Sequence, residues 1–175
     1  MYLMASIQIS PEHNIPKIIE ILGLEPGGSR PAEYYRFEGG HLHVDGVTQE
    51  QLEEAWAIYN NNIEDYLLTP TRDHRKEELS RQTAEYIAEK YPVFRQQMFQ
   101  ALYSEARANG WDTRSQYIGS LLDWIKSVAG MAIMKEEEVD AGGTVEEING
   151  VGLDLSSFDA SDPNITIKVA INISD

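Results

Sequence analysis

Cysteine is absent from this chain of 175 residues. Disulfide bonds and metal sites built on thiolates are therefore excluded, and the composition makes no demand on an oxidising compartment. Long apolar runs are missing too, since the longest, around residues 128–134, is far too short to span a bilayer. Residues 1–10 lack the basic flank and the continuous apolar run of a secretory signal. We therefore expect a protein that is made in the cytoplasm and does not embed in a membrane.

Catalytic sequence motifs are also lacking. The chain has no glycine-rich phosphate loop followed by lysine, no nucleophile elbow and no His-Glu-x-x-His pair. Carboxylates are plentiful, but no pair of them stands in the apolar surroundings that raise the pKa of a catalytic acid. The sequence therefore predicts a protein that is not an enzyme, with no catalytic residue and no cofactor.

Basic residues are scarce relative to acidic ones. The chain has 14 Lys and Arg against 29 Asp and Glu, which gives a net charge of −15. From Glu136 onward, ten acidic residues accompany a single base, Lys168. Such a surface repels nucleic acid and anionic membranes, so we expect neither as a partner. Acidic segments of this kind are more often a solvated face than a site for a basic partner.

One pair of histidines has a spacing that can hold a metal ion. His41 and His43 would lie on the same face of an expected strand. Only Asp45 is near enough in sequence to act as a third ligand, and His-x-His on an exposed hairpin is common without metal. We therefore predict no metal site there.

An acidic turn near the C-terminus is the second place where a cation could bind. It is formed by Asp159, Asp162 and Asn164. The turn lacks the ordered ligand spacing and the trailing bidentate glutamate of a calcium loop. Asx turns, in which a short polar side chain bonds to nearby backbone, explain it better.

The first third of the chain has the pattern of a small mixed module, β-α-β-β-α. Alternating apolar residues predict one strand within residues 1–10 and two more on either side of Gly39-Gly40. A tight hairpin is expected at this glycine pair because both turn residues must adopt positive φ. A short helix follows the first strand, and Thr48 and Gln51 have the spacing of a capping box for a second helix.

The middle of the chain, residues 69–135, is predicted to be helical with one interruption. The break is expected at Tyr91-Pro92, because proline disfavours helix at the preceding residue and has no backbone N–H. After the break, the spacing of Phe94 and Met98 predicts the apolar face of the second helix.

A third helix follows Gly110 and is expected to run to about Met134. Because only a short glycine-containing loop joins it to the second helix, the two are predicted to form an antiparallel hairpin.

The end of the chain, residues 136–175, is expected to be an acidic arm that finishes in a β-strand. Its last apolar residues alternate with polar or small ones, which is typical of a strand that buries one face. Such a strand could add to a sheet in another subunit, or it could pair with residues 5–9 of its own chain. The candidate interface residues are this apolar row and one aromatic anchor, namely Ile165, Ile167, Val169, Ile171, Ile173 and Trp111.

These patterns together predict an α+β fold in three parts. They are a small module at residues 1–68, a helical hairpin at 69–135 and an arm at 136–175.

Several of these stretches resemble small tail-associated proteins of bacteriophages. They are the turn and capped helix at residues 44–55, the Tyr91-Pro92 break, the glutamine-rich helix at 96–103 and the Trp-Ile segment at 124–128. The resemblance implies a non-enzymatic structural or adaptor subunit of the tail, at the baseplate or the fibre attachment. It also implies synthesis in the host cytoplasm, tail or fibre proteins as partners, and a homo-oligomer or a larger assembly.

Two other functions stay open. A chaperone that holds a tail-fibre protein during assembly, and is absent from the mature particle, would suit an acidic chain with an exposed apolar edge. An enzyme would need a carboxylate site, for which a large apolar pocket with clustered acids would be the sign.

Overall fold

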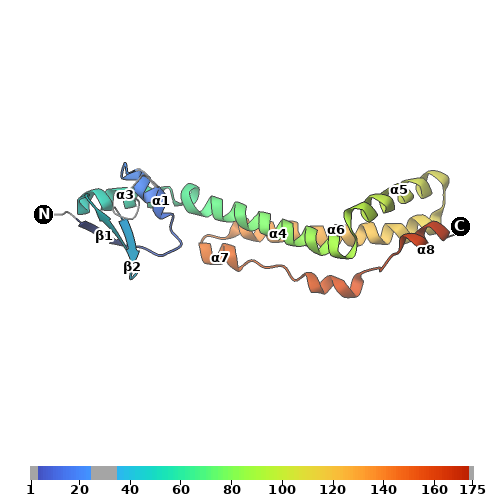
Figure 1. Cartoon of the computed structure of the whole chain (residues 1–175). Coiled ribbons are helices and arrows are strands. Elements are labelled where there is room, and N and C mark those ends of the chain that lie inside the picture. The colour runs from blue at the N-terminus through green and yellow to red at the C-terminus, as the bar shows by residue number, and fades with distance from the viewer. Residues whose placement is uncertain (1–3, 25–34, 174–175) are drawn as a thin grey trace. The chain divides into compact units, whose positions relative to one another are not determined.

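The computed structural model describes residues 4–24 and 35–173. The described part of the chain is mostly helical and contains one three-stranded antiparallel sheet, an α+β composition (Figure 1). The chain divides into two compact units, which we call the N-terminal unit and the helical unit. The N-terminal unit is Met1–Asp73 with Gly143–Val145, and the helical unit is His74–Gly142 with Glu146–Asp175.

The sheet of the N-terminal unit has β3 (His41–Asp45) in its centre. Strands β1 (Met4–Gln8) and β2 (Tyr35–Glu38) pair with it on either side, both antiparallel. Gly39 and Gly40 join β2 to β3 with φ values of 59° and 78°, so the predicted glycine hairpin is confirmed. The strand predicted within residues 1–10 is also confirmed.

Two helices cover this sheet, and both begin at a polar cap. Helix α1 (Ile15–Ile21) follows Asn14, whose side chain accepts a hydrogen bond from the first turn. Helix α3 (Gln49–Asn61) starts with the predicted capping box. Thr48 Oγ1 accepts from the N–H of Gln51 at 3.2 Å, and Gln51 Oε1 accepts from the N–H of Thr48 at 2.9 Å. These caps satisfy backbone donors that would otherwise be unpaired at the helix starts.

The N-terminal unit has its own apolar core between the sheet and the two helices. Tyr59 of α3 is fully buried in it, and its hydroxyl accepts a hydrogen bond from the N–H of Asn14 at 3.0 Å. The bond ties α3 to the start of α1. The buried residues of this core are Ala5, Ile9, Ile18, Ile19, Leu42, Val44, Val47, Leu52 and Tyr59.

Three long helices form the body of the helical unit. A π-helical turn, η1 (Glu64–Leu68), leads into α4 (Thr69–Lys90), which is followed by α5 (Val93–Asn109) and α6 (Asp112–Ala141). The break predicted at Tyr91-Pro92 is confirmed, because α4 ends just before it. Gly110 ends α5 in the left-handed conformation, with φ 69°.

Helix α6 is longer than the sequence pattern indicated, since it continues past Met134 to Ala141. Two carboxylates at its acidic end have cationic partners, which favours continued helix there. Lys135 Nζ lies 2.7 Å from a carboxylate oxygen of Glu138, one turn away, and Lys76 of α4 pairs with Asp140. Such pairs offset the repulsion between neighbouring acids on one helix face.

The second apolar core lies where α6 meets α4 and α5. In the helical unit α6 runs back along both of these helices (Figure 1), and the α5–α6 contact is the predicted hairpin. Near the Tyr91-Pro92 break, the ring of Tyr91 lies 5.7 Å from that of Trp124. The buried residues of this core are Ile87, Tyr91, Phe99, Ile118, Leu121, Trp124, Val128, Ile165 and Ala170.

The predicted C-terminal strand is wrong. After α6 the chain forms α7 (Val145–Gly150), a 3-10 helix η2 (Leu155–Ser161) and α8 (Ile167–Asn172). The described residues beyond Ala141 contain no strand. Thr166 caps α8, because its Oγ1 accepts a hydrogen bond from the N–H of Val169 at 3.4 Å.

The C-terminal segment is helical and not extended because the buried side chains there do not alternate with exposed ones, as they would in a strand. Ile165 and Ala170 are buried, at 5% and 0% exposed, whereas Val169 and Ile171 are 46% and 50% exposed. A strand would have placed Ala170 on the polar face. In a helix the segment satisfies its own backbone hydrogen bonds, whereas a strand needs a neighbouring sheet edge to do so.

Candidate interaction surface on the helical unit

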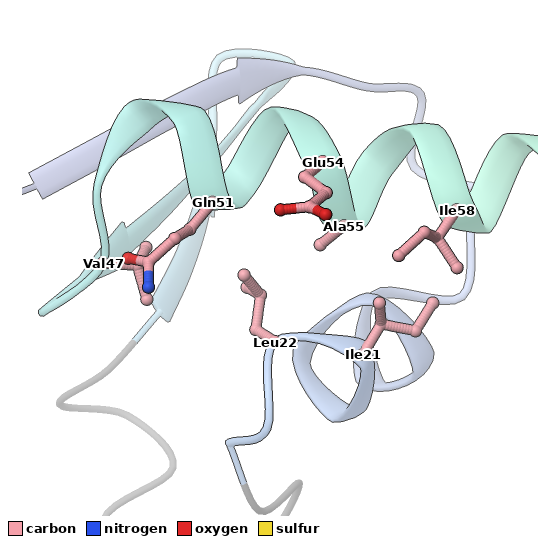
Figure 2. A pocket seen from close by; sticks show the side chains of 7 residues that line it. All are labelled: Ile21, Leu22, Val47, Gln51, Glu54, Ala55 and Ile58. Carbon is pink, nitrogen blue, oxygen red and sulfur yellow. The ribbon is translucent and has the colours of Figure 1, made fainter.

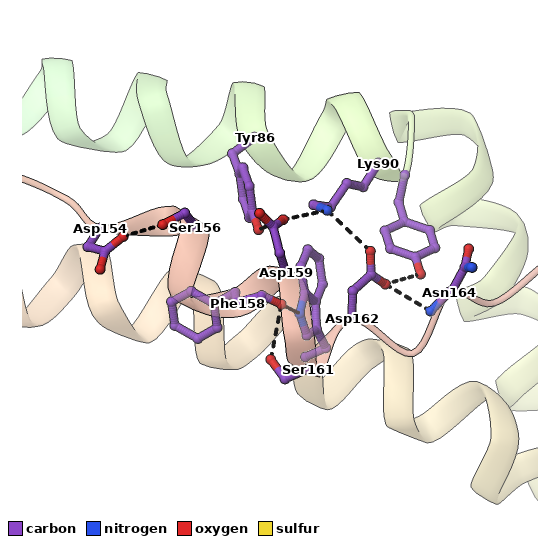
Figure 3. A network of polar contacts seen from close by, with 11 residues as sticks. Tyr86, Lys90, Asp154, Ser156, Phe158, Asp159, Ser161, Asp162 and Asn164 are labelled. Carbon is purple, nitrogen blue, oxygen red and sulfur yellow. Dashed lines mark hydrogen bonds and ion pairs between the residues drawn. The ribbon is translucent and has the colours of Figure 1, made fainter.

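A cluster of charged and phenolic side chains fixes the C-terminal segment to α4 (Figure 3). We call it the clasp: Tyr86, Lys90, Tyr91, Asp159 and Asp162. Lys90 Nζ lies 2.8 Å from Asp159 Oδ1 and 3.4 Å from Asp162 Oδ2. The hydroxyl of Tyr86 donates to Asp159 at 2.8 Å, and that of Tyr91 donates to Asp162 at 2.6 Å. The clasp thus joins the end of α4 to η2 and the turn after it.

Hydrogen bonds from the helices to backbone atoms hold the rest of the segment. Trp124 Nε1 of α6 donates to the carbonyl oxygen of Phe158 at 3.1 Å. Further along, the N–H of Ile165 donates to the hydroxyl of Tyr91 at 3.1 Å. Arg114 Nη2 donates to the carbonyl oxygen of Ile173 at 2.8 Å, at the end of α8.

The C-terminal segment is therefore an integral part of the helical unit. It packs on α5 and α6 of its own chain through α8. Neither pairing considered from the sequence is observed, because the segment is not extended and β1 pairs with β3.

The acidic turn is part of the clasp. The N–H of Asn164 donates to Asp162 Oδ1 at 2.9 Å, which is an Asx turn, as the sequence indicated. Asn164 has a φ of 49°, a conformation that asparagine tolerates better than most residues. Both carboxylates of the turn have lysine and tyrosine partners that saturate much of their accepting capacity.

These contacts shift the ionisation of the clasp. Hydrogen bonds from Lys90 and then Tyr86 lower the pKa of Asp159. Burial opposes ionisation of Asp162, but bonds from Tyr91, the Asn164 N–H and Lys90 outweigh it and lower the pKa of that carboxyl. The hydrogen bond to Asp159 raises the pKa of Lys90. Burial, with the hydrogen bond to Asp162, raises the pKa of Tyr91 to about 12.

We expect acid to open the clasp. Because the folded-state pKa values of Asp159 and Asp162 are lowered, their stabilising contribution is present above the unfolded pKa, near 4. It is lost as the pH falls through the folded values. Hydrogen exchange of the Ile165 N–H between pH 7 and pH 3 would follow this, with protection falling at the acid end.

The double variant Asp159→Asn/Asp162→Asn serves as the control. Its protection at Ile165 should be weaker at neutral pH and flatter through the acid range, since neither side chain titrates. Identical pH profiles for the variant and the natural chain would contradict a role for the clasp carboxylates.

The two histidines show no metal-binding arrangement. The ring centroids of His41 and His43 lie 6.2 Å apart, tilted by 31°. Within residues 4–24 and 35–173, no group of three or more His, Asp or Glu side chains could hold a metal ion.

The structure disperses the six candidate interface residues. Ile165 is buried, and Ile167 and Ile173 are half-buried. Trp111 is half-buried, with the guanidinium of Arg114 lying 4.4 Å from its ring centroid. The two side chains that remain exposed are those of α8, Val169 and Ile171.

Three exposed apolar residues at the start of α5 were not identified as surface residues from the sequence. Val93, Phe94 and Met98 are 60%, 59% and 42% exposed. The predicted apolar face of this helix is wrong for Phe94 and Met98, because the buried side chain is Phe99. The signal was present in the sequence as Phe94 and Phe99, two aromatics that cannot lie on the same face of a helix.

A small cavity links α5 to α8. Its volume is about 250 Å³, and Arg95 and Lys168 line it together with Ile165, Thr166 and Ile167. The guanidinium of Arg95 also lies 5.8 Å from the ring centroid of Phe94. Two exposed apolar residues are sequence neighbours of the cations that line this cavity, since Phe94 precedes Arg95 and Val169 follows Lys168. We call this region the α5–α8 surface: Val93, Phe94, Arg95, Met98, Lys168, Val169 and Ile171.

A second cavity, of about 280 Å³, lies in the N-terminal unit between α1 and α3 (Figure 2). Glu54 is the one ionisable side chain in its lining, and Gln51 beside it is already used in the capping box. Neither of these two cavities contains a pair of carboxylates that could share acid and base roles. The lining consists of Ile21, Leu22, Val47, Gln51, Glu54, Ala55 and Ile58.

In the described part of the chain, no helix has the length and apolar character needed to cross a membrane. Comparison with known proteins gave no matching family model, no matching curated protein and no matching solved structure.

Proposed function

We propose that the chain is a non-enzymatic structural or adaptor subunit of a bacteriophage tail, which attaches to neighbouring proteins through the α5–α8 surface. The observation that supports an adaptor role is the group of five exposed apolar side chains on α5 and α8: Val93, Phe94, Met98, Val169 and Ile171. Successive residues of an α-helix are rotated by about 100°, so Val93, Phe94 and Met98 lie on one side of α5. Apolar residues gathered in this way are typical of interaction sites, whereas scattered ones are ordinary. The phage setting rests on the sequence resemblance.

In this proposal the helical hairpin is the rigid body, and the C-terminal segment reinforces it. The clasp and Trp124 hold that segment through side chains and backbone. Attachment therefore occurs through side chains of α5 and α8 and not through an added strand. The proposed partners are tail or fibre proteins, or further copies of the chain, at the baseplate or at the fibre attachment.

Mass spectrometry of purified particles of a phage whose genome encodes this chain would test the proposal. A structural subunit should be present in a constant ratio to the other tail proteins after gradient purification. A fibre-assembly chaperone should be bound to fibre protein in infected cells and missing from the particles. Absence from both would overturn the phage proposal.

A surface variant connects this experiment to the structure. Val93→Ser/Phe94→Ser should reduce incorporation, because it removes apolar contact area without disturbing a buried side chain. The matched control is Ile133→Ser/Met134→Ser, which changes two equally exposed apolar residues of α6. Equal incorporation of both variants would place the attachment elsewhere.

A further inference from the structure

We infer that the α5–α8 surface binds an acidic, amphipathic segment of a partner protein. The inference rests on the proposed function, in which this surface is an interface, and adds the chemistry of the partner. It follows from the local charge, the cavity and the two cations of the surface.

The surface lies in stretches of the chain that contain no acid. Residues 92–104 and 163–173 contain no Asp or Glu, and their charged residues are Arg95 and Lys168. In a chain with a net charge of −15, these two stretches together carry a charge of +2. Opposite charge on a partner would be attracted here and repelled by most of the remaining surface.

Among the described residues, the two cations of this surface have no acidic partner. Within the ranges 4–24 and 35–173, neither Arg95 nor Lys168 forms an ion pair, and both side chains are exposed. Lys90, the last residue of α4, differs from them because both clasp carboxylates neutralise it. Arg95 is the residue type best suited to bind a carboxylate through two parallel hydrogen bonds.

The cavity between α5 and α8 supplies the apolar half of the site. Ile165 and Ile167 line it, and Arg95 and Lys168 line it as well. An apolar side chain of the partner would enter the cavity, while carboxylates on either side of it would meet the two cations. Phe94 and Val169, next to these cations in sequence, are exposed and would add apolar contacts with the partner. This arrangement of a buried anchor with a charged rim is typical of peptide-binding sites.

An anionic membrane is the main competing occupant, because exposed apolar residues beside Arg and Lys also suit a lipid surface. The net charge of −15 opposes that binding, since two cations cannot offset the repulsion of the whole chain. A protein segment contacts only the α5–α8 surface. Acidic residues that lie farther from it than the screening length repel it little.

The test uses the full chain and a labelled helical peptide of about 18 residues, with leucines on one face and glutamates on the other. A second peptide has the same leucines with lysines in place of the glutamates, and phosphatidylglycerol vesicles represent the membrane. Fluorescence anisotropy would follow peptide binding and sedimentation would follow vesicle binding. We expect the glutamate peptide to bind at least about tenfold more tightly than the lysine peptide, and more weakly at high salt.

Two variants assign the binding to the surface. Arg95→Glu/Lys168→Glu should weaken binding of the glutamate peptide by about tenfold or more. The matched control, Arg81→Glu/Lys126→Glu, makes the same change of charge on exposed parts of α4 and α6 and should leave the affinity nearly unchanged. Circular dichroism of each variant would confirm that the fold is kept.

Each other outcome overturns the inference in a distinct way. Equal binding of both peptides, lost in Val93→Ser/Phe94→Ser, would keep the surface as an interface and refute the acidic partner. Vesicle binding without peptide binding would make the surface a membrane contact. Failure of both peptides and vesicles to bind would refute the inference, while incorporation into particles tests the proposed function separately.

Discussion

Replacing Tyr91 by alanine is expected to lower the free energy of unfolding of the helical unit by about 3–5 kcal/mol, the usual cost of removing a large buried aromatic. Its side chain is almost fully buried at the break between α4 and α5. The ring lies against those of Phe99 and Trp124, with centroid distances of 6.4 and 5.7 Å. The substitution would leave a cavity where the α4, α5 and α6 helices meet.

Tyr91→Phe separates the hydrogen bonds of this residue from its packing. Without the hydroxyl, the N–H of Ile165 loses its acceptor and Asp162 loses a donor at 2.6 Å. Unpaired buried polar groups typically cost about 1–3 kcal/mol, so this variant should fall between the natural chain and the alanine variant.

Urea unfolding followed by circular dichroism would measure these changes, because most of the helical signal comes from the helical unit. Ser161→Ala is the matched control, since it removes an exposed local hydrogen bond to Phe158 in the same segment. Its effect should stay within about 0.5 kcal/mol. Equal stability of Tyr91→Phe and the natural chain would refute the anchoring role of the hydroxyl.

The features predicted correctly are those that a few neighbouring residues determine. Pro92 cannot donate a backbone hydrogen bond and restricts the residue before it, whatever packs around them. The Thr48–Gln51 box satisfies its own helix start, and Gly39-Gly40 can take positive φ at no steric cost. Each of these features was therefore visible without knowledge of the tertiary fold.

The prediction of a C-terminal strand was wrong because the alternation of apolar and polar residues is only a local preference. The isoleucines from residue 165 to 173 favour strand by type and by period, but no sheet edge of the described chain pairs with them. Ile165 and the small Ala170 are instead buried in the core of the helical unit, where α8 contacts α5 and α6. Tyr91 and Arg114, which are distant in sequence, then bond to the backbone of the segment. No local pattern could have shown these contacts.

The sequence pattern identified only some residues of the α5–α8 surface, because the tertiary contacts that decide exposure are not visible in it. Val169 and Ile171 belong to the predicted apolar row, although in a helix and not in a strand. The face of α5 was ambiguous, since Phe94 with Met98 and Phe99 with Ala106 are both compatible with helical spacing. Packing against α6 decided in favour of Phe99 and left Phe94 exposed.

Alanine substitutions at Phe99 and Phe94 should therefore have very different effects on stability, although both remove a phenylalanine from α5. Phe99 is fully buried in the core of the helical unit. Phe99→Ala should lower the free energy of unfolding by about 3–5 kcal/mol, whereas Phe94→Ala should change it by no more than about 0.5 kcal/mol. Urea unfolding would measure both.

The affinity for the leucine–glutamate peptide should show the reverse order, with the larger effect at Phe94, if this exposed side chain contacts a partner. Phe94→Ala should weaken binding of the leucine–glutamate peptide several-fold while the protein remains as stable as the natural chain. A loss of stability in Phe94→Ala would mean that its ring packs within the chain. Unchanged stability with unchanged peptide affinity would remove Phe94 from the interface. The pair of variants thus separates a side chain that stabilises the fold from one that the fold presents to other molecules.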